Sequence, residues 1–200
     1  RGVTGTNPAD IVPAGGKFLS VPHHYLDEDV KKIVKAITDG KPWTTKKPTT
    51  TKPTTRRTTT PKPLDLKCLM VGDLYNFGSD EERYLDEAEF LSQLSYDFFE
   101  STTVKPMAGL WAYGHTTFPE SPDLSSITAN RSVFEKQLRG MLYRRKSNAS
   151  TTAYAIEVIN KMLEDSRMNC LVFLAASNDT RTEFNLINEK TRLVAVGLDG

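Results

Sequence analysis

A Thr/Pro/Lys-rich segment at residues 41–64 limits what this chain can fold into. It contains ten Thr, five Pro, seven Lys or Arg and no acid, and Trp43 is its only aromatic side chain. Because so little apolar surface cannot offset the entropy of ordering, we expect a disordered linker over 41–65 with extended polyproline II backbone. Such tracts are typical of O-glycosylated stalks, although an unglycosylated spacer would have the same composition. The folded part must therefore come from residues 1–40 and 66–200.

The N-terminal piece is too small to fold alone. Residues 17–21 (KFLSV) predict a strand. The apolar side chains of Val30, Ile33, Val34 and Ile37 then recur with helical spacing, and Asp27 is the expected N-cap of that helix. One strand and one helix cannot bury a core, so this piece needs a partner.

Strands and helices alternate from residue 66 onward. The expected strands cover 68–71, 107–113, 170–175 and 193–196, and the expected helices start at Ser79, Ser132 and Thr151, with a short one over 183–189. The side chains expected to be buried are Leu85, Ala88, Leu91, Leu94 and Phe98 in the first helix, and Val133, Phe134, Leu138, Met141 and Leu142 in the second. Continuous apolar strands alternating with helices indicate an α/β fold, a doubly wound and mostly parallel sheet with helices on both faces.

Composition excludes several function classes. The net charge is +1, but the linker holds seven of the positive charges, so the remainder carries about −6 and is not expected to bind nucleic acid. No apolar run reaches the ~20 residues of a membrane span. The chain has no GxSxG, HExxH, P-loop or paired CxxC motif, and His115 is the only histidine after the linker. We therefore expect a binding protein and no enzyme.

Four sequence blocks resemble a known family. VGDLYNFG, AGLWAYGHTTFP, CLVFLAASNDT and RLVAVGLDG are similar to the von Willebrand factor A-type domain, and more narrowly to its divergent nematode form, found in extracellular proteins beside C-type lectin modules. The resemblance covers 66–200 and implies a Rossmann-like fold that lacks its own last strand and helix. Residues 3–40 look like that ending. Residues 1–40 thus either belong to a neighbouring domain of a tandem array or dock on 66–200.

The family usually binds a divalent metal through an Asp-x-Ser-x-Ser loop, a Thr and a distant Asp. The matching positions here are Asp73, Tyr75, Phe77, Ser150 and Asp179. A phenylalanine cannot coordinate, and a tyrosine hydroxyl lies too far from its backbone to replace a serine. We therefore expect no cofactor, and we interpret Asp73 as a turn carboxylate satisfied by loop amides. Mg²⁺ bound by Asp73, Ser150 and Asp179 is the alternative.

The same strand ends could bind an extracellular protein or glycan without metal. The expected partner-binding rim comprises Tyr75, Asn76, Phe77, His115, Thr116, Thr117 and Phe118, since aromatic side chains are favoured as interface anchors. The alternative is that Phe77 and Phe118 pack into the domain.

Three sequons, at Asn130, Asn148 and Asn178, favour a secreted glycoprotein. By the family's strand order Cys68 and Cys170 lie on adjacent parallel strands, where a bridge is uncommon, so we expect two buried free thiols. The leading hypothesis is thus an extracellular adhesion or recognition module. A structural spacer that presents a lectin-like module, and a metal-dependent receptor domain, are the alternatives.

Overall fold

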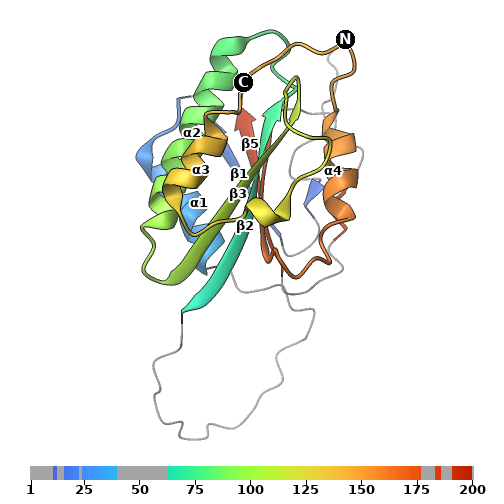
Figure 1. Cartoon of the computed structure of the whole chain (residues 1–200). Helices are drawn as coiled ribbons and strands as arrows, with labels where there is room; N and C mark the ends of the chain where they lie inside the picture. Colours follow the sequence, from blue (N-terminus) through green and yellow to red (C-terminus); the bar gives the residue numbers. More distant parts are fainter. Residues whose placement is uncertain are drawn as a thin grey trace, which may run out of the picture.

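The apolar runs of this chain form a single parallel sheet. The computed structural model describes residues 11–12, 16–22, 24–39, 63–176, 183–185 and 191–199. Within them five strands, all parallel, lie in the order β1-β5-β4-β2-β3 (Figure 1). The strands are β1 (Lys17–Pro22), β2 (Leu64–Leu74), β3 (Val104–Gly114), β4 (Cys170–Ala175) and β5 (Arg192–Asp199). The helices are α1 (Asp27–Asp39), α2 (Glu81–Phe99), α3 (Arg131–Leu138), α4 (Thr152–Asn160) and the short 3-10 helix η2 (Leu124–Ser126).

Helices cover both faces of the sheet. Helices α1, α2 and α3 lie on one face and α4 on the other (Figure 1). Successive side chains of a strand point to opposite faces of the sheet, and the central strand β4 shows this alternation. In β4, Val172 packs in the core under α1–α3, whereas Leu171 and Phe173 pack in the core under α4. All six residues of β4 are buried, which is the signature of a strand covered on both sides. The α/β doubly wound fold expected from the sequence is confirmed.

Residues 17–39 supply the edge of this sheet. β1 pairs in parallel with β5, from Lys17 opposite Val194 to Pro22 opposite Asp199. The guanidinium of Arg192 in β5 donates to the carbonyls of Ile37 and Thr38, each at 2.7 Å, and so satisfies the C-terminal end of α1. Residues 40–62, most of the expected linker, lie outside the described residues. The linker was expected to reach 65, but β2 already begins at Leu64.

Three helices begin at residues other than those predicted. The carbonyl of Leu26 accepts from the amides of Asp29 and Val30, so Leu26 takes the N-cap place expected for Asp27. The N-cap of α2 is Asp80, one residue after Ser79, and that of α3 is Asn130, two residues before Ser132. In α2 and α3 a carboxylate or amide oxygen provides the cap that the sequence analysis assigned to a serine hydroxyl. The helix expected from Thr151 does begin there, with Thr151 as the cap of α4.

The buried stripes also differ in part from the prediction. Leu85 is 61% exposed, and Val133 and Leu142 are 44% and 40% exposed. The buried face of α2 contains Tyr84 and Glu87, which lie one helical turn apart on the same side of the helix. Leu85 lies on a different side and is therefore not part of this face. Residues 183–185, the described part of the expected helix over 183–189, are not helical.

The two cysteines form a disulfide, and the expectation of free thiols is wrong. Cys68 in β2 lies directly opposite Cys170 in β4, with the two Cα atoms 4.2 Å apart. Residues in register on parallel neighbours point to the same face, which brings the two sulfur atoms together. Both residues are fully buried in the core beneath α1–α3. The bond therefore joins the central strand β4 to its neighbour β2.

Candidate functional site

The candidate site lies at the carboxyl ends of β2, β3 and β4, at the top of Figure 1. The chain runs from β2 outward to β3 on one side, whereas β4, β5 and β1 lie on the other side of β2. The strand order therefore reverses between β2 and β4. In doubly wound sheets this reversal leaves a crevice where ligands bind. Asp73 lies at the end of β2, and Ala176 directly follows β4.

Asp73 closes this crevice with its buried carboxylate. Its Oδ1 accepts hydrogen bonds from the amides of Tyr75, at 2.8 Å, and Asn76, at 3.1 Å. Its Oδ2 accepts from the amide of Ala176, at 2.9 Å, and from the side-chain amide of Asn76. These donors come from both sides of the crevice and satisfy both oxygens. Asp73 thus has the turn role that its sequence context predicts.

Asn76 extends this network to helix α4. Its Nδ2 also donates to the hydroxyl of Thr152 at 2.8 Å. That hydroxyl is 3.2 Å from the phenol oxygen of Tyr113, which donates onward to the carbonyl of Leu174 at 3.4 Å. Tyr113 is buried, and burial followed by the charge of Asp73 raises the pKa of its phenol well above the usual range. A chain of neutral donors therefore connects β2, β3, β4 and α4.

The residues of this network do not fit a divalent cation. A cation such as Mg²⁺ needs oxygen ligands around it, but the nitrogen of the Asn76 amide lies between the oxygens of Asp73 and Thr152. Ser150, a ligand in the alternative with bound Mg²⁺, lies two residues before Thr152 in the wall of a surface hollow. Asp179 lies outside the described residues. The described residues also contain no group of three or more His, Cys, Asp or Glu side chains arranged to hold a metal.

A second carboxyl group, Glu87 of α2, lies behind Asp73. Its Oε1 accepts from the amide of Asp73 at 2.5 Å, while Oε2 has no hydrogen-bond partner. Burial, and secondarily the charge of Asp73, raises the pKa of Glu87 well above its usual range and so favours the protonated carboxyl group. A Cβ on Gly72 would lie 2.6 Å from Sδ of Met141 and 3.2 Å from Oε1 of Glu87. Glycine at this position therefore permits the close packing of Glu87.

Glu87 was not predicted as a site residue, although the sequence contains a signal for it. Tyr84, Glu87, Leu91, Leu94 and Phe98 recur at helical spacing and are all buried in α2. An acid within such a stripe marks a carboxyl group that points into the core, where it needs a hydrogen-bond partner.

Only part of the expected rim lies at the surface. Thr117 is exposed, and Tyr75 is partly exposed with its ring stacked on that of His115 at 6.3 Å. Thr116 is buried, and the side-chain amide of Asn76 is used inside the Asp73 network. The remaining two rim residues, Phe77 and Phe118, are partly buried against the core, as the packing alternative predicts.

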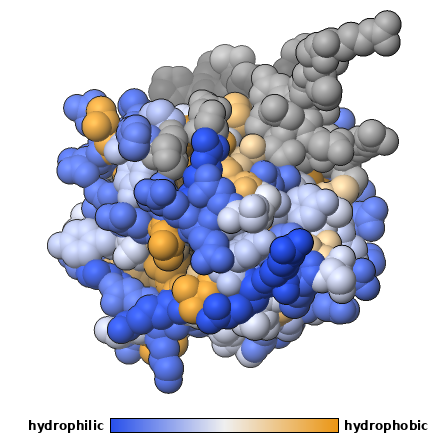
Figure 2. Space-filling model, turned by 90° about the horizontal axis from the view of Figure 1, so that it is seen from above, coloured by the Kyte–Doolittle hydropathy of each residue, from blue (hydrophilic) through white to orange (hydrophobic). Residues whose placement is uncertain are grey.

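Two adjoining hollows lie over these strand ends, and His115 and Ser147 belong to both. The first has a volume of about 730 Å³ and is lined by Tyr75, Glu120, Asn148, Ala149, Ser150, Thr151 and Tyr154 besides the two shared residues. The second has a volume of about 600 Å³ and is lined by Gly78, Ser79, Tyr143, Arg145 and Lys146 besides the same two. Figure 2 views the molecule from the strand-end side, and this face is mostly hydrophilic, with small hydrophobic patches. The two hollows together are called the strand-end groove below.

The segment 143–151 that lines this groove was not recognised from the sequence. Its signal was the run Arg144-Arg145-Lys146 followed by small polar residues, which lies in a connection without regular secondary structure. One of the three sequons lies in this segment, since exposed Asn148 lines the first hollow. Asn130 is exposed and caps α3 through its side-chain oxygen, and Asn178 lies outside the described residues.

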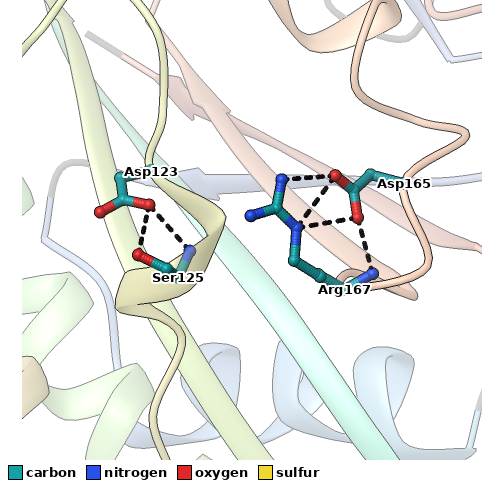
Figure 3. Close-up of polar contacts among 4 residues, drawn as sticks. All are labelled: Asp123, Ser125, Asp165 and Arg167. Atoms are coloured by element: carbon teal, nitrogen blue, oxygen red, sulfur yellow. Dashed lines mark hydrogen bonds and ion pairs between the residues drawn. The ribbon is translucent and has the colours of Figure 1, made fainter.

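Two further polar pairs, drawn in Figure 3, each stabilise a connection between elements of the fold. Asp123 caps η2 by accepting from the amide of Ser125 at 2.9 Å and its hydroxyl at 2.6 Å. Arg167 pairs with Asp165, and its hydrogen bonds lower the pKa of Asp165 to about 2. Each of the four side chains is engaged in the turn to which it belongs. Both pairs are therefore structural.

No protein-family model, no curated protein and no solved structure matches this chain.

Proposed function

We propose that the chain is an extracellular recognition module that binds a protein or glycan through the strand-end groove, without a metal ion. The observation that carries this proposal is that two neighbouring features differ. The crevice is filled by the Asp73 carboxylate and its hydrogen-bond donors, whereas the strand-end groove next to it is open. Because its own chain satisfies Asp73, the crevice offers nothing to a cation. Above it, the aromatic rings of Tyr75, His115 and Tyr154 stand among small polar groups, a mixture that suits reversible recognition.

An extracellular location is supported by the disulfide. Bonds such as Cys68–Cys170 persist in oxidising compartments and are rare in the cytosol. In addition, no described helix has the length and apolar character needed to cross a bilayer.

A binding role is favoured over catalysis by the state of His115. Its Nδ1 accepts a hydrogen bond from the backbone amide of Lys146 at 3.0 Å, which holds the neighbouring segment in place. Among the described residues, no nucleophilic side chain forms a hydrogen bond with this ring. The histidine therefore has a structural task here, and no nucleophile–base pair supports an enzyme.

The two-piece arrangement is also part of the proposal. We infer that residues 1–40 are the final strand and helix of the same A-type domain as 66–200, because β1 extends the sheet at β5 and Arg192 caps α1. A protease site inserted between 41 and 62 provides the test. After cleavage under native conditions the two pieces should co-elute on size exclusion. Separate elution would contradict the arrangement.

The binding proposal is tested by blocking the groove. Ser147→Trp places a large ring in both hollows, and Ser166→Trp is the matched control. Both serines are exposed, but Ser166 lies in the connection that enters β4, at the other end of the sheet. The full chain and both variants are measured on an array of neutral and anionic glycans and on purified extracellular-matrix proteins.

We expect at least one probe to bind in the presence of EDTA, and Ser147→Trp to weaken this binding by about tenfold or more. Ser166→Trp should have no effect. If no probe binds, or if both variants bind alike, recognition through the groove is refuted and the spacer hypothesis is favoured. Loss of all binding in EDTA would instead favour the metal-dependent receptor.

A further inference from the structure

We propose that the strand-end groove takes an anionic oligosaccharide, with its sulfate or carboxylate groups on Arg145 and Lys146 and a sugar ring in the neighbouring hollow. This inference rests on the proposed recognition function and names the ligand class of the same groove. It depends on three features of the groove. These are the cations at Arg145 and Lys146, the aromatic and small polar groups of the first hollow, and the single acid, Glu120, in the described lining.

The cations of the groove are held in a defined place. The amide of Arg144 donates to the carbonyl of His115 at 2.6 Å, and the amide of Lys146 donates to Nδ1 of the same residue at 3.0 Å. Just before these residues, the ring of Tyr143 lies 5.3 Å from the ring of His115 and 5.2 Å from that of Tyr84, on which it stacks. The segment is therefore anchored to the end of β3 and to α2, which lowers the entropic cost of presenting its charges to a ligand.

These positive charges are available to a ligand. The side chains of Arg144, Arg145 and Lys146 are exposed, and the ion pairs formed among the described residues all involve other groups. Arg145 and Lys146 line the second hollow, whose described lining contains no acid. A guanidinium and an ammonium side by side suit the planar or tetrahedral oxygens of carboxylate and sulfate groups.

The first hollow has the chemistry of a sugar site. A sugar ring presents an apolar C–H face and a border of hydroxyls. Tyr75 and His115 offer stacked rings, and Tyr154, which is 40% exposed, also lines this hollow from the first turn of α4. Asn148, Ser150 and other small polar groups of the lining can donate to or accept from hydroxyls.

Glu120 decides between an oligosaccharide and an acidic peptide. Among the described residues it is the only acid that lines the first hollow, and it is exposed. A carboxylate accepts hydrogen bonds from sugar hydroxyls, but it repels a chain that carries negative charge at every residue. A ligand with its charges at Arg145 and Lys146 and neutral hydroxyls near Glu120 therefore fits this groove best.

The test measures binding of a keratan sulfate octasaccharide, sulfated on alternate rings only, to the full chain by isothermal titration calorimetry. The protein is made in the bacterial periplasm, where the disulfide forms and Asn148 carries no glycan. The desulfated, neutral octasaccharide and poly-glutamate of similar length are the comparison probes. Arg145→Gln with Lys146→Gln removes the cations, and Lys136→Gln with Arg139→Gln is the matched control, since both of its residues are exposed at or just beyond the end of α3.

We expect the sulfated octasaccharide to bind, and its affinity to fall by about tenfold or more with the groove pair of substitutions and to be unchanged with the control pair. The desulfated probe should bind at least about tenfold more weakly. Tyr154→Ala should weaken the octasaccharide several-fold and leave poly-glutamate unaffected. Circular dichroism of each variant checks that the fold is intact.

Three results would overturn the inference. The first is equal affinity for the groove variant and its control. The second is poly-glutamate binding as tightly as the octasaccharide with no effect of Tyr154→Ala, which would assign the groove to acidic peptides. The third is that no anionic probe binds while the Ser147→Trp variant still loses a neutral glycan or matrix protein. In that last case the proposed recognition function stands and only the ligand class fails.

Discussion

Removing the side-chain amide of Asn76 tests the polar network at the crevice most directly. Asn76→Ala keeps the backbone amide that donates to Asp73. It removes the two shorter bonds made by Nδ2, to the Asp73 carboxylate and to the hydroxyl of Thr152, together with a long contact of 3.5 Å to the phenol oxygen of Tyr113. A hydrogen bond to a charged group contributes about 1.5–3 kcal/mol and one to a neutral group about 0.5–1.5 kcal/mol. The variant should therefore lose about 2–4 kcal/mol of unfolding free energy.

Urea denaturation followed by far-UV circular dichroism provides the measurement. A loss of this size should also lower the melting temperature by about 5–15 °C. Asn148→Ala, in non-glycosylated protein, is the matched control, because Asn148 is exposed and forms no hydrogen bond among the described residues. A change below about 0.5 kcal/mol in Asn76→Ala would refute the view that this amide holds the crevice closed.

Three other changes test the surroundings of the network. The pKa of Glu87 is raised in the folded protein, well above the value of 4.5 expected for the unfolded chain. At a pH between these two pKa values the native state keeps a proton that the unfolded state has lost. This group therefore makes the free energy of unfolding fall as pH rises. Glu87→Gln should therefore be more stable relative to the parent chain at pH 8 than at pH 5, and denaturation at both values measures the difference. Cys68→Ala with Cys170→Ala opens a loop of 102 residues and should cost about 4 kcal/mol in chemical denaturation. Addition of 1 mM Mg²⁺ or Mn²⁺ to the parent chain should shift its melting temperature by less than about 1 °C, whereas a clear rise would contradict the fit argued for Asp73.

Local sequence patterns were sufficient to predict the fold class. The run from Cys170 to Ala175 has no polar residue, which predicts a strand buried on both faces. In the structure this run forms β4, and all six of its residues are buried. The same local information fails at helix ends and on helix faces. For α2 the predicted stripe was purely apolar, but Glu87 is buried because its carboxyl group accepts from the amide of Asp73. The hydrogen bond offsets the cost of burial, and it exists only once strand and helix are packed together.

The candidate site was predictable only where its contacts are local. Asp73 accepts from amides two and three residues away, so its turn role could be inferred. Asn76, in contrast, was assigned to the rim, because its partner Thr152 is 76 residues away. The disulfide was missed for another reason. Cys68 and Cys170 were expected on adjacent parallel strands, but a bridge there was rejected as uncommon, and only the exact register of β2 and β4 places the two residues opposite each other.

The closed crevice and the cationic segment are linked by charge. In the arrangement implied by the family resemblance, a metal would supply the positive charge that attracts an acidic ligand. Here the amide of Asn76 is neutral and supplies no positive charge beside the carboxylate of Asp73. The proposed anionic oligosaccharide would instead find its positive charge at the exposed Arg145 and Lys146, which line the second hollow. Exchanging a central metal for peripheral cations predicts a binding affinity that falls with salt concentration and does not change with chelators.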